Sequence, residues 1–252
     1  MYIFADIFRQ DLTDVRDIFT TSIFALLMSA PSRISEVLSL SIDCMFTNKT
    51  RKGDQKWGLR FWAGKGFGGD IKWIPSTMVP VTQKAIYRII EITKEARKFA
   101  KLMELDFKSF HKQSKFKEYA ESKVLSAIQI CEILFNDTFS EKECKKRLKR
   151  LSLVFHDDFY SLKTLWQELQ MRLPNGFPWF NKSKNIKYSN LLFLFFRDTF
   201  HTNKSNNIIE IYVPDRYLFQ GNVLAHKRRN TIFQRHGYQN GRERTIYFHS
   251  RS

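Results

Sequence analysis

Arg33 and Glu36 are the first residues of this sequence whose types and spacing suit a chemical role. They open a short segment with one apolar face, residues 33–40, that we predict to be helical. A guanidinium is planar and permanently charged, so Arg33 at a helix start can hold two oxygens of a phosphate group. Glu36 lies one turn further on and can pair with Arg33, which would fix the orientation of the guanidinium. The same two residues also fit an ordinary surface ion pair, worth about 0–1 kcal/mol.

Lys65 is the second candidate, because glycines surround it on what we predict to be the tip of a β-hairpin. These glycines are Gly64, Gly66, Gly68 and Gly69. A lysine on such a tip can donate a proton to a leaving oxygen as a general acid. The segment lacks the Gly-Lys-Ser/Thr ending of a nucleotide-binding loop, and it also fits a plain hairpin turn with a solvated lysine. Lys72, on the predicted outgoing strand, is the alternative lysine.

Periodicity predicts the elements that must position these side chains. Residues 13–30 have apolar positions at helical spacing, with Thr13 as the expected N-cap and a proline after the end. The polar stretch 47–55 has turn preference. Residues 56–63 alternate as a strand, and residues 70–75 return as the second strand of a hairpin. From Thr82 the apolar period becomes helical as far as residue 103. The expected order is therefore helix, hairpin, long helix.

The remaining sequence is basic and aromatic, and we expect residues 104–230 to form an enlarged helical insertion. Helices are predicted for residues 123–134 and 140–153, a loop for residues 173–184 and a buried element for residues 188–199. The whole chain is expected to be mainly α with a small β-hairpin or sheet, in the α+β class.

The charge balance indicates a polyanionic partner. Lys and Arg number 42 against 25 Asp and Glu, a formal net charge of +17, and hydrophobic residues make up 43%, enough for a buried core. Such an excess favours nucleic acid or an anionic membrane surface, although a basic solubilising surface is the plainer interpretation. No apolar run is longer than that of residues 191–196, which is far shorter than the ~20 residues that span a bilayer.

Three cysteines, with no CxxC pair among them, are typical of a reducing cytoplasm, and no signal peptide is recognised at the amino end. Cys131, Cys144 and His156 are the residues nearest to a metal-ligand set, but their spacing fits no common zinc pattern. We therefore expect no metal and no cofactor, and a cytoplasmic location.

The stretch of residues 30–43 resembles the first catalytic box of the tyrosine recombinases, the phage-integrase family, in which an Arg opening a helix is followed by Glu, Leu and Asp. Here these are Arg33, Glu36, Leu40 and Asp43. Gly64-Lys65-Gly66 and the segment from Lys72 to Pro75 are similar to the family's hairpin, so the resemblance covers about residues 13–103.

This resemblance implies a tyrosine-recombinase-like catalytic domain, encoded by a bacterium or phage, that works in site-specific recombination or integration. It implies that Arg33 and Lys65 are catalytic, that Glu36 supports Arg33, and that a Tyr nucleophile attacks DNA without metal or cofactor. The implied partner is duplex DNA, and the family leaves room for a homo-oligomer on DNA.

The family's second box, His-x-x-Arg, has an imperfect match. His226-Lys227-Arg228-Arg229 has the spacing but reads as a basic surface run. His249, with its apolar lead-in, is the better candidate for the box histidine, and no tyrosine follows it. We therefore expect an incomplete and inactive site. The expected domains are residues 1–103 as the first part of the catalytic domain, 104–230 as the insertion and 231–252 as the lead-in to the second box.

Two basic clusters are the candidate phosphate contacts on DNA: Lys145, Lys146, Arg147, Lys149 and Arg150 in the first, and Lys227, Arg228 and Arg229 in the second. Each also fits the solvated face of a helix. Site-specific recombination is the leading functional hypothesis. A non-catalytic, basic DNA-binding remnant or decoy is the alternative, and RNA binding through exposed aromatics is the third.

Overall fold

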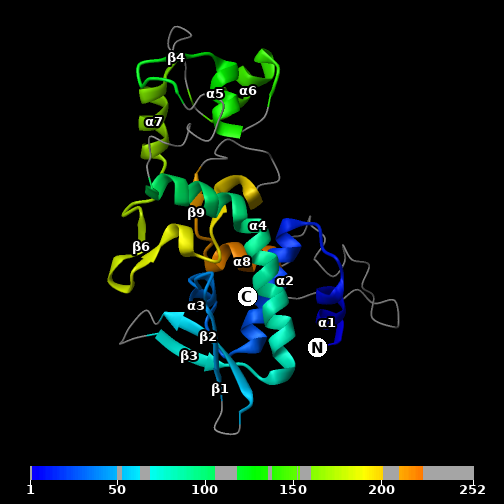
Figure 1. Cartoon of the computed structure of the whole chain (residues 1–252). Helices are drawn as coiled ribbons and strands as arrows, with labels where there is room; N and C mark the ends of the chain where they lie inside the picture. The colour runs from blue at the N-terminus through cyan, green and yellow to red at the C-terminus, as the bar shows by residue number, and fades with distance from the viewer. Residues whose placement is uncertain are drawn as a thin grey trace, which may run out of the picture. The chain divides into compact units, whose positions relative to one another are not determined.

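The chain folds into helices and small antiparallel sheets (Figure 1). The structure is a computed structural model that describes residues 2–49, 53–62, 69–105, 118–135, 138–151, 153, 160–200 and 210–223. These residues divide into two compact units. Unit 1 takes its residues from Met1–Lys94, Asn190–Phe193 and Val213–Ser252, and unit 2 from Glu95–Ser189 and Leu194–Tyr212. The α+β class predicted from the sequence is confirmed.

Unit 1 contains the helices α1 (Tyr2–Arg9), α2 (Val15–Ser29), α3 (Ile34–Leu38) and α8 (Arg216–Val223), with the first part of α4 (Val79–Leu105). Helix α2 confirms the prediction for residues 13–30, but its N-cap is Asp14 and not Thr13. The Asp14 carboxylate accepts the backbone N–H groups of Arg16 and Asp17 at 2.8 and 3.2 Å. Because a carboxylate also interacts favourably with the helix dipole, Asp14 is the stronger cap.

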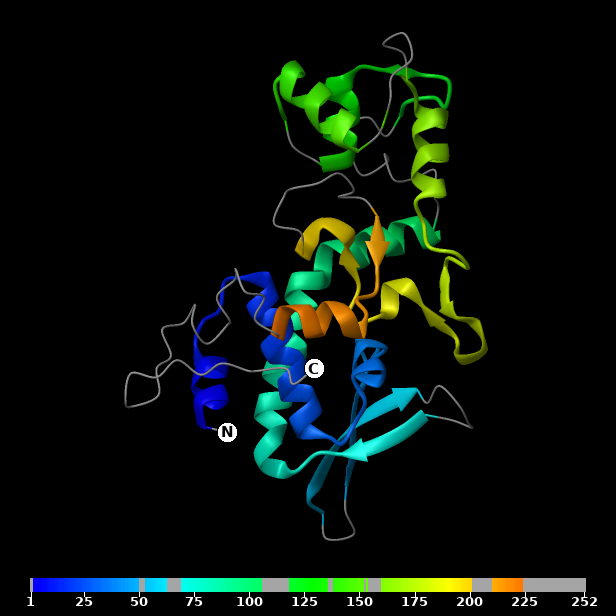
Figure 2. The same ribbon diagram turned by 180° about the vertical axis from the view of Figure 1, so that it is seen from behind.

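A three-stranded antiparallel sheet packs in the same unit, with the strand order β1 (Met45–Lys49), β2 (Gln55–Trp62), β3 (Gly69–Trp73). Strands β2 and β3 confirm the paired strands of the predicted hairpin, and in both views α3 lies next to the sheet (Figure 2). The turn predicted for residues 47–55 is wrong at Gln55, which begins β2, and at 47–49, which belong to β1. These residues are exposed on an edge strand, so no hydrophobic alternation marks them.

Residues from the second half of the chain complete the core of unit 1. The backbone of Leu192 donates to Leu40 at 2.8 Å, and Ile42 donates to Asn190 at 2.9 Å. The ring of Phe193 meets that of Phe19 edge to face at 6.1 Å, and both are buried. The predicted buried element at residues 188–199 is therefore buried at its centre, as turns and one short strand.

Helix α4 confirms the long helix predicted from Thr82. Six residues of the predicted apolar stripe are buried and the seventh, Ile90, is half-buried; the six are Ile86, Ile89, Thr93, Ala96, Ala100 and Met103. Residues up to Lys94 belong to unit 1 and those from Glu95 to unit 2. Among the described residues, no helix is both long and apolar enough to cross a membrane.

Unit 2 joins three further helices to short strand pairs. Its helices are α5 (Ala127–Phe135), α6 (Glu141–Arg150) and α7 (Leu162–Met171), so the helices predicted for residues 123–134 and 140–153 exist but are shorter. The strand pairs are β4 (Val124–Leu125) with β5 (Tyr160–Ser161), β6 (Trp179–Asn181) with β7 (Ile186–Lys187), and β8 (Phe195–Phe196) with β9 (Ile211–Tyr212). The predicted loop at 173–184 therefore contains one short strand.

Candidate functional site

Glu36 accepts hydrogen bonds from two directions at the start of α3. One oxygen, Oε2, accepts the backbone N–H of Arg33 at 2.9 Å and the Nζ of Lys72 at 2.9 Å. These three residues are called the Arg33–Glu36–Lys72 cluster below. The hydrogen bond from the Arg33 backbone, followed by the hydrogen bond from Lys72, lowers the pKa of Glu36 below its ordinary value, against a smaller opposing effect of burial. The carboxylate is therefore a fixed anion that orders the groups around it.

Strand register brings Lys72 to this carboxylate. Lys72 pairs with Leu59 across the β2–β3 ladder, and Phe61 lies two residues further along β2, so the Lys72, Leu59 and Phe61 side chains share one face of the sheet. That face is the buried one, because Leu59 and Phe61 are almost fully covered. The Lys72 ammonium lies 4.7 Å from the centre of the Phe61 ring as well as 2.9 Å from Glu36. Two contacts therefore hold the ammonium in place.

Arg33 is the N-cap of α3, with an extended backbone (φ −85°, ψ 150°) and an exposed side chain. The prediction that Glu36 pairs with the Arg33 guanidinium is wrong, because Glu36 binds the Arg33 backbone N–H and pairs with Lys72. A Glu at the third helical position commonly reaches back to the N-cap N–H in this way. Within the part of the chain that the structure describes, the Arg33 guanidinium has no ion-pair partner.

Several predicted site residues lie outside the described residues. These are Lys65, His249, Lys227, Arg228 and Arg229. The structure therefore describes Arg33, Glu36 and Lys72 of the predicted catalytic set, and it brings Lys72, the alternative lysine, into contact with Glu36.

Helix α6 carries the whole first basic cluster, in unit 2. Lys145 pairs with Glu141 at 3.0 Å, and Arg147 pairs with Glu143 at 2.9 Å and covers the Phe139 ring at 3.9 Å. The other three, Lys146, Lys149 and Arg150, are exposed.

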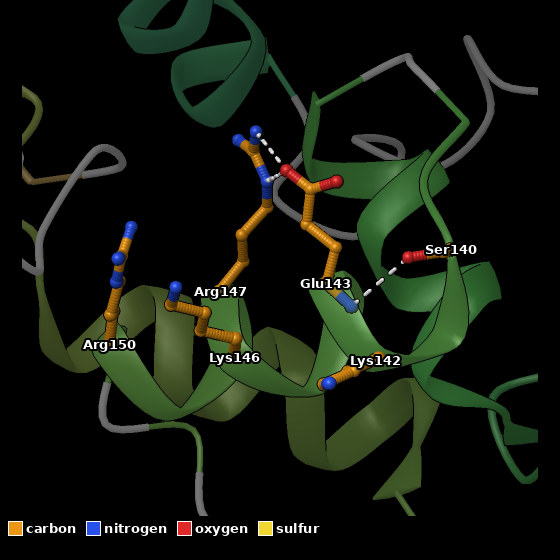
Figure 3. A pocket seen from close by; sticks show the side chains of 6 residues that line it. All are labelled: Ser140, Lys142, Glu143, Lys146, Arg147 and Arg150. Carbon is orange, nitrogen blue, oxygen red and sulfur yellow. Dashed lines mark hydrogen bonds and ion pairs between the residues drawn. The ribbon is translucent and has the colours of Figure 1, made fainter.

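An open hollow of about 260 Å³ lies against this helix (Figure 3). Ser140, Lys142, Glu143, Lys146, Arg147 and Arg150 line it. Lys142 was not among the predicted contacts, although the four-residue spacing of 142, 146 and 150 would have indicated it.

Comparisons with protein-family models, with curated proteins and with solved structures each returned no match to this chain. The function of this chain is therefore inferred from the geometry of its described residues. It provides an exposed guanidinium and an ordered ammonium beside one carboxylate in unit 1, and a line of exposed cations in unit 2. Both arrangements suit oxyanion ligands.

Proposed function

We propose that this chain binds duplex DNA for site-specific recombination of the tyrosine-recombinase type, and that Arg33 and Lys72 contact a phosphodiester. The observation that carries the proposal is the pair of 2.9 Å hydrogen bonds that Glu36 accepts. The bond from Lys72 joins a residue of β3 to a residue of α3, 36 positions apart in sequence, and the bond from Arg33 closes the start of α3 itself. An ordered ion pair beside an exposed arginine is the kind of prearranged charge that phosphoryl chemistry uses.

Arg33 supports the proposal through its exposure and its fixed backbone. Arg33 is the N-cap of α3, with an exposed side chain and a backbone N–H that Glu36 accepts. A guanidinium in such a position can contact two non-bridging oxygens of one phosphate. Lys72 adds a compact point charge, held by the same carboxylate that accepts the Arg33 backbone N–H. The chain's net charge of +17 attracts the polyanion to both.

Within this proposal Lys72 is a phosphate-binding residue. Its ammonium already donates to Glu36 at 2.9 Å and rests on the Phe61 ring, so it serves best as a fixed charge. The proton for a leaving 5′-oxygen is assigned to Lys65, on the resemblance alone.

A non-catalytic DNA-holding protein is the second candidate. The exposed cations of α6 favour it, because they can hold a phosphate backbone without any reacting group. The two candidates differ in sequence selectivity, since recombination needs a defined site and simple holding does not.

Selection from a pool of random duplexes tests the proposal. Recombination predicts enrichment of one duplex sequence, with weaker binding of that sequence by Arg33→Gln and by Lys72→Gln. Duplex binding without enrichment supports the holding protein instead. Tighter binding of single-stranded RNA than of any duplex would contradict both candidates. The matched control is Lys94→Gln, an exposed lysine of unit 1 on α4 with no contact to the Arg33–Glu36–Lys72 cluster.

A further inference from the structure

The cations of α6 fall into two classes that the sequence alone does not separate. Lys145 and Arg147 form ion pairs one turn back along the helix, with Glu141 and Glu143. Lys142, Lys146, Lys149 and Arg150 have no ion-pair partner among the residues that the structure describes. All four are exposed.

Helical geometry gathers the four unpaired cations on one side. At 3.6 residues per turn, positions 142, 146, 149 and 150 fall within about 100° of one another and span about 12 Å along the axis. Cys144 and Leu148, on the opposite side, are buried. The two Glu-paired cations flank the line on either side. Figure 3 shows Lys142, Lys146 and Arg150 following one another along the helix while Arg147 turns to Glu143.

We propose that Lys142, Lys146, Lys149 and Arg150 form a phosphate-binding stripe for the backbone of duplex DNA, while the ion pairs of Lys145 and Arg147 stabilise the helix. This inference rests on the proposed function for DNA as the partner. It changes the predicted contact set, since it removes two residues and adds Lys142. The hollow that Lys142, Lys146 and Arg150 line, together with Ser140, Glu143 and Arg147, is the place that this proposal assigns to a phosphate group.

The chemistry of α6 favours a duplex backbone over single-stranded RNA. The ten residues of the helix include no aromatic side chain on which an unpaired base can stack. The nearest ring in sequence, Phe139, is already covered by the Arg147 guanidinium at 3.9 Å. Lysines and an arginine without stacking partners bind phosphates and leave base sequence unread.

Two double variants of the full chain, each removing one Lys and one Arg from the same helix, test the stripe. The first is Lys146→Gln with Arg150→Gln, and the control is Lys145→Gln with Arg147→Gln. Binding to a labelled duplex is measured by fluorescence anisotropy between about 50 and 200 mM salt. The salt slope is the slope of the logarithm of the binding constant against the logarithm of the salt concentration, and each lost phosphate contact lowers its magnitude by about 0.9. The stripe variant, which loses two contacts, is therefore expected to have a slope smaller by roughly 1.8. At 0.1 M salt its binding is expected to weaken roughly tenfold for each lost contact.

Equal losses in the two double variants overturn the stripe, because they mean that only net charge matters. A larger loss in the control variant, or an unchanged slope in the stripe variant, overturns it as well. The charge-retaining exchange Lys146→Arg with Arg150→Lys is expected to bind as the wild type does, and its failure to bind would also overturn the stripe. The proposed function is tested separately, with Arg33→Gln and Lys72→Gln, so either proposal can fail while the other stands.

Discussion

Replacing Glu36 by Gln and by Ala separates the two hydrogen bonds that its carboxylate accepts. Gln still accepts the Arg33 backbone N–H but loses the ion pair with Lys72. In that pair the Glu36 side chain is 26% exposed and the Lys72 side chain 22%. A pair covered to this degree contributes about 0.5–1 kcal/mol. Ala loses the helix-capping hydrogen bond as well, which adds about 1 kcal/mol. We therefore expect the free energy of unfolding in urea at pH 7 to fall by about 0.5–1 kcal/mol for Glu36→Gln and by about 1.5–2 kcal/mol for Glu36→Ala.

The contribution of Glu36 to the free energy of unfolding depends on pH. The pKa of Glu36 is lowered in the folded chain, so its contribution is fully present above the ordinary value of 4.5 and disappears as the pH falls through the lowered pKa. The difference between wild type and Glu36→Gln is therefore expected to shrink below pH 4.5. Lys72→Gln is expected to cost less in the Glu36→Gln background than alone. A Gln variant as stable as wild type at pH 7, with additive effects of the two substitutions, would refute the reasoning.

Three other predictions concern the packing. Gly58→Ala places a Cβ 2.7 Å from an isoleucine side chain on β3, so we expect a loss of about 1–3 kcal/mol in thermal unfolding; an unchanged midpoint would contradict the sheet packing. The carboxylate of Glu104 accepts the backbone N–H and the hydroxyl of Ser189 at 3.0 and 2.8 Å, so Glu104→Gln should cost about 1 kcal/mol, and no cost would count against that pair. Burial raises the pKa of Cys44 and of Cys131 to about 12, so neither thiol should react with a thiol reagent at pH 8 until the chain is denatured; rapid native labelling would disprove their burial.

Local patterns in the sequence predicted the elements around the candidate site. The helical period of α4, the alternation of β2 and β3 and the short helix after Pro31 each depend on residues that are close in sequence. Their ends were less accurate, because one or two hydrogen bonds decide a cap. Asp14 accepts two backbone N–H groups and is the N-cap in place of Thr13.

Contacts between distant residues could not be predicted in the same way. The pairing of Lys72 with Glu36 depends on the register of β3 against β2, and the segment Asn190–Phe193 joins the core of unit 1 only through the fold of the whole chain. The sequence showed the basic run of α6 but not which cations pair with Glu141 and Glu143.

Salt dependence of duplex binding tests the central proposal, that Arg33 and Lys72 contact DNA phosphates, most directly. The test variant is Arg33→Gln with Lys72→Gln, and the matched control is Arg9→Gln with Lys94→Gln, two exposed residues of unit 1 that do not contact the cluster. The account predicts that the test variant lowers the salt slope by roughly 1.8 while the control changes it by less than half as much. Equal slopes for the two variants would contradict it.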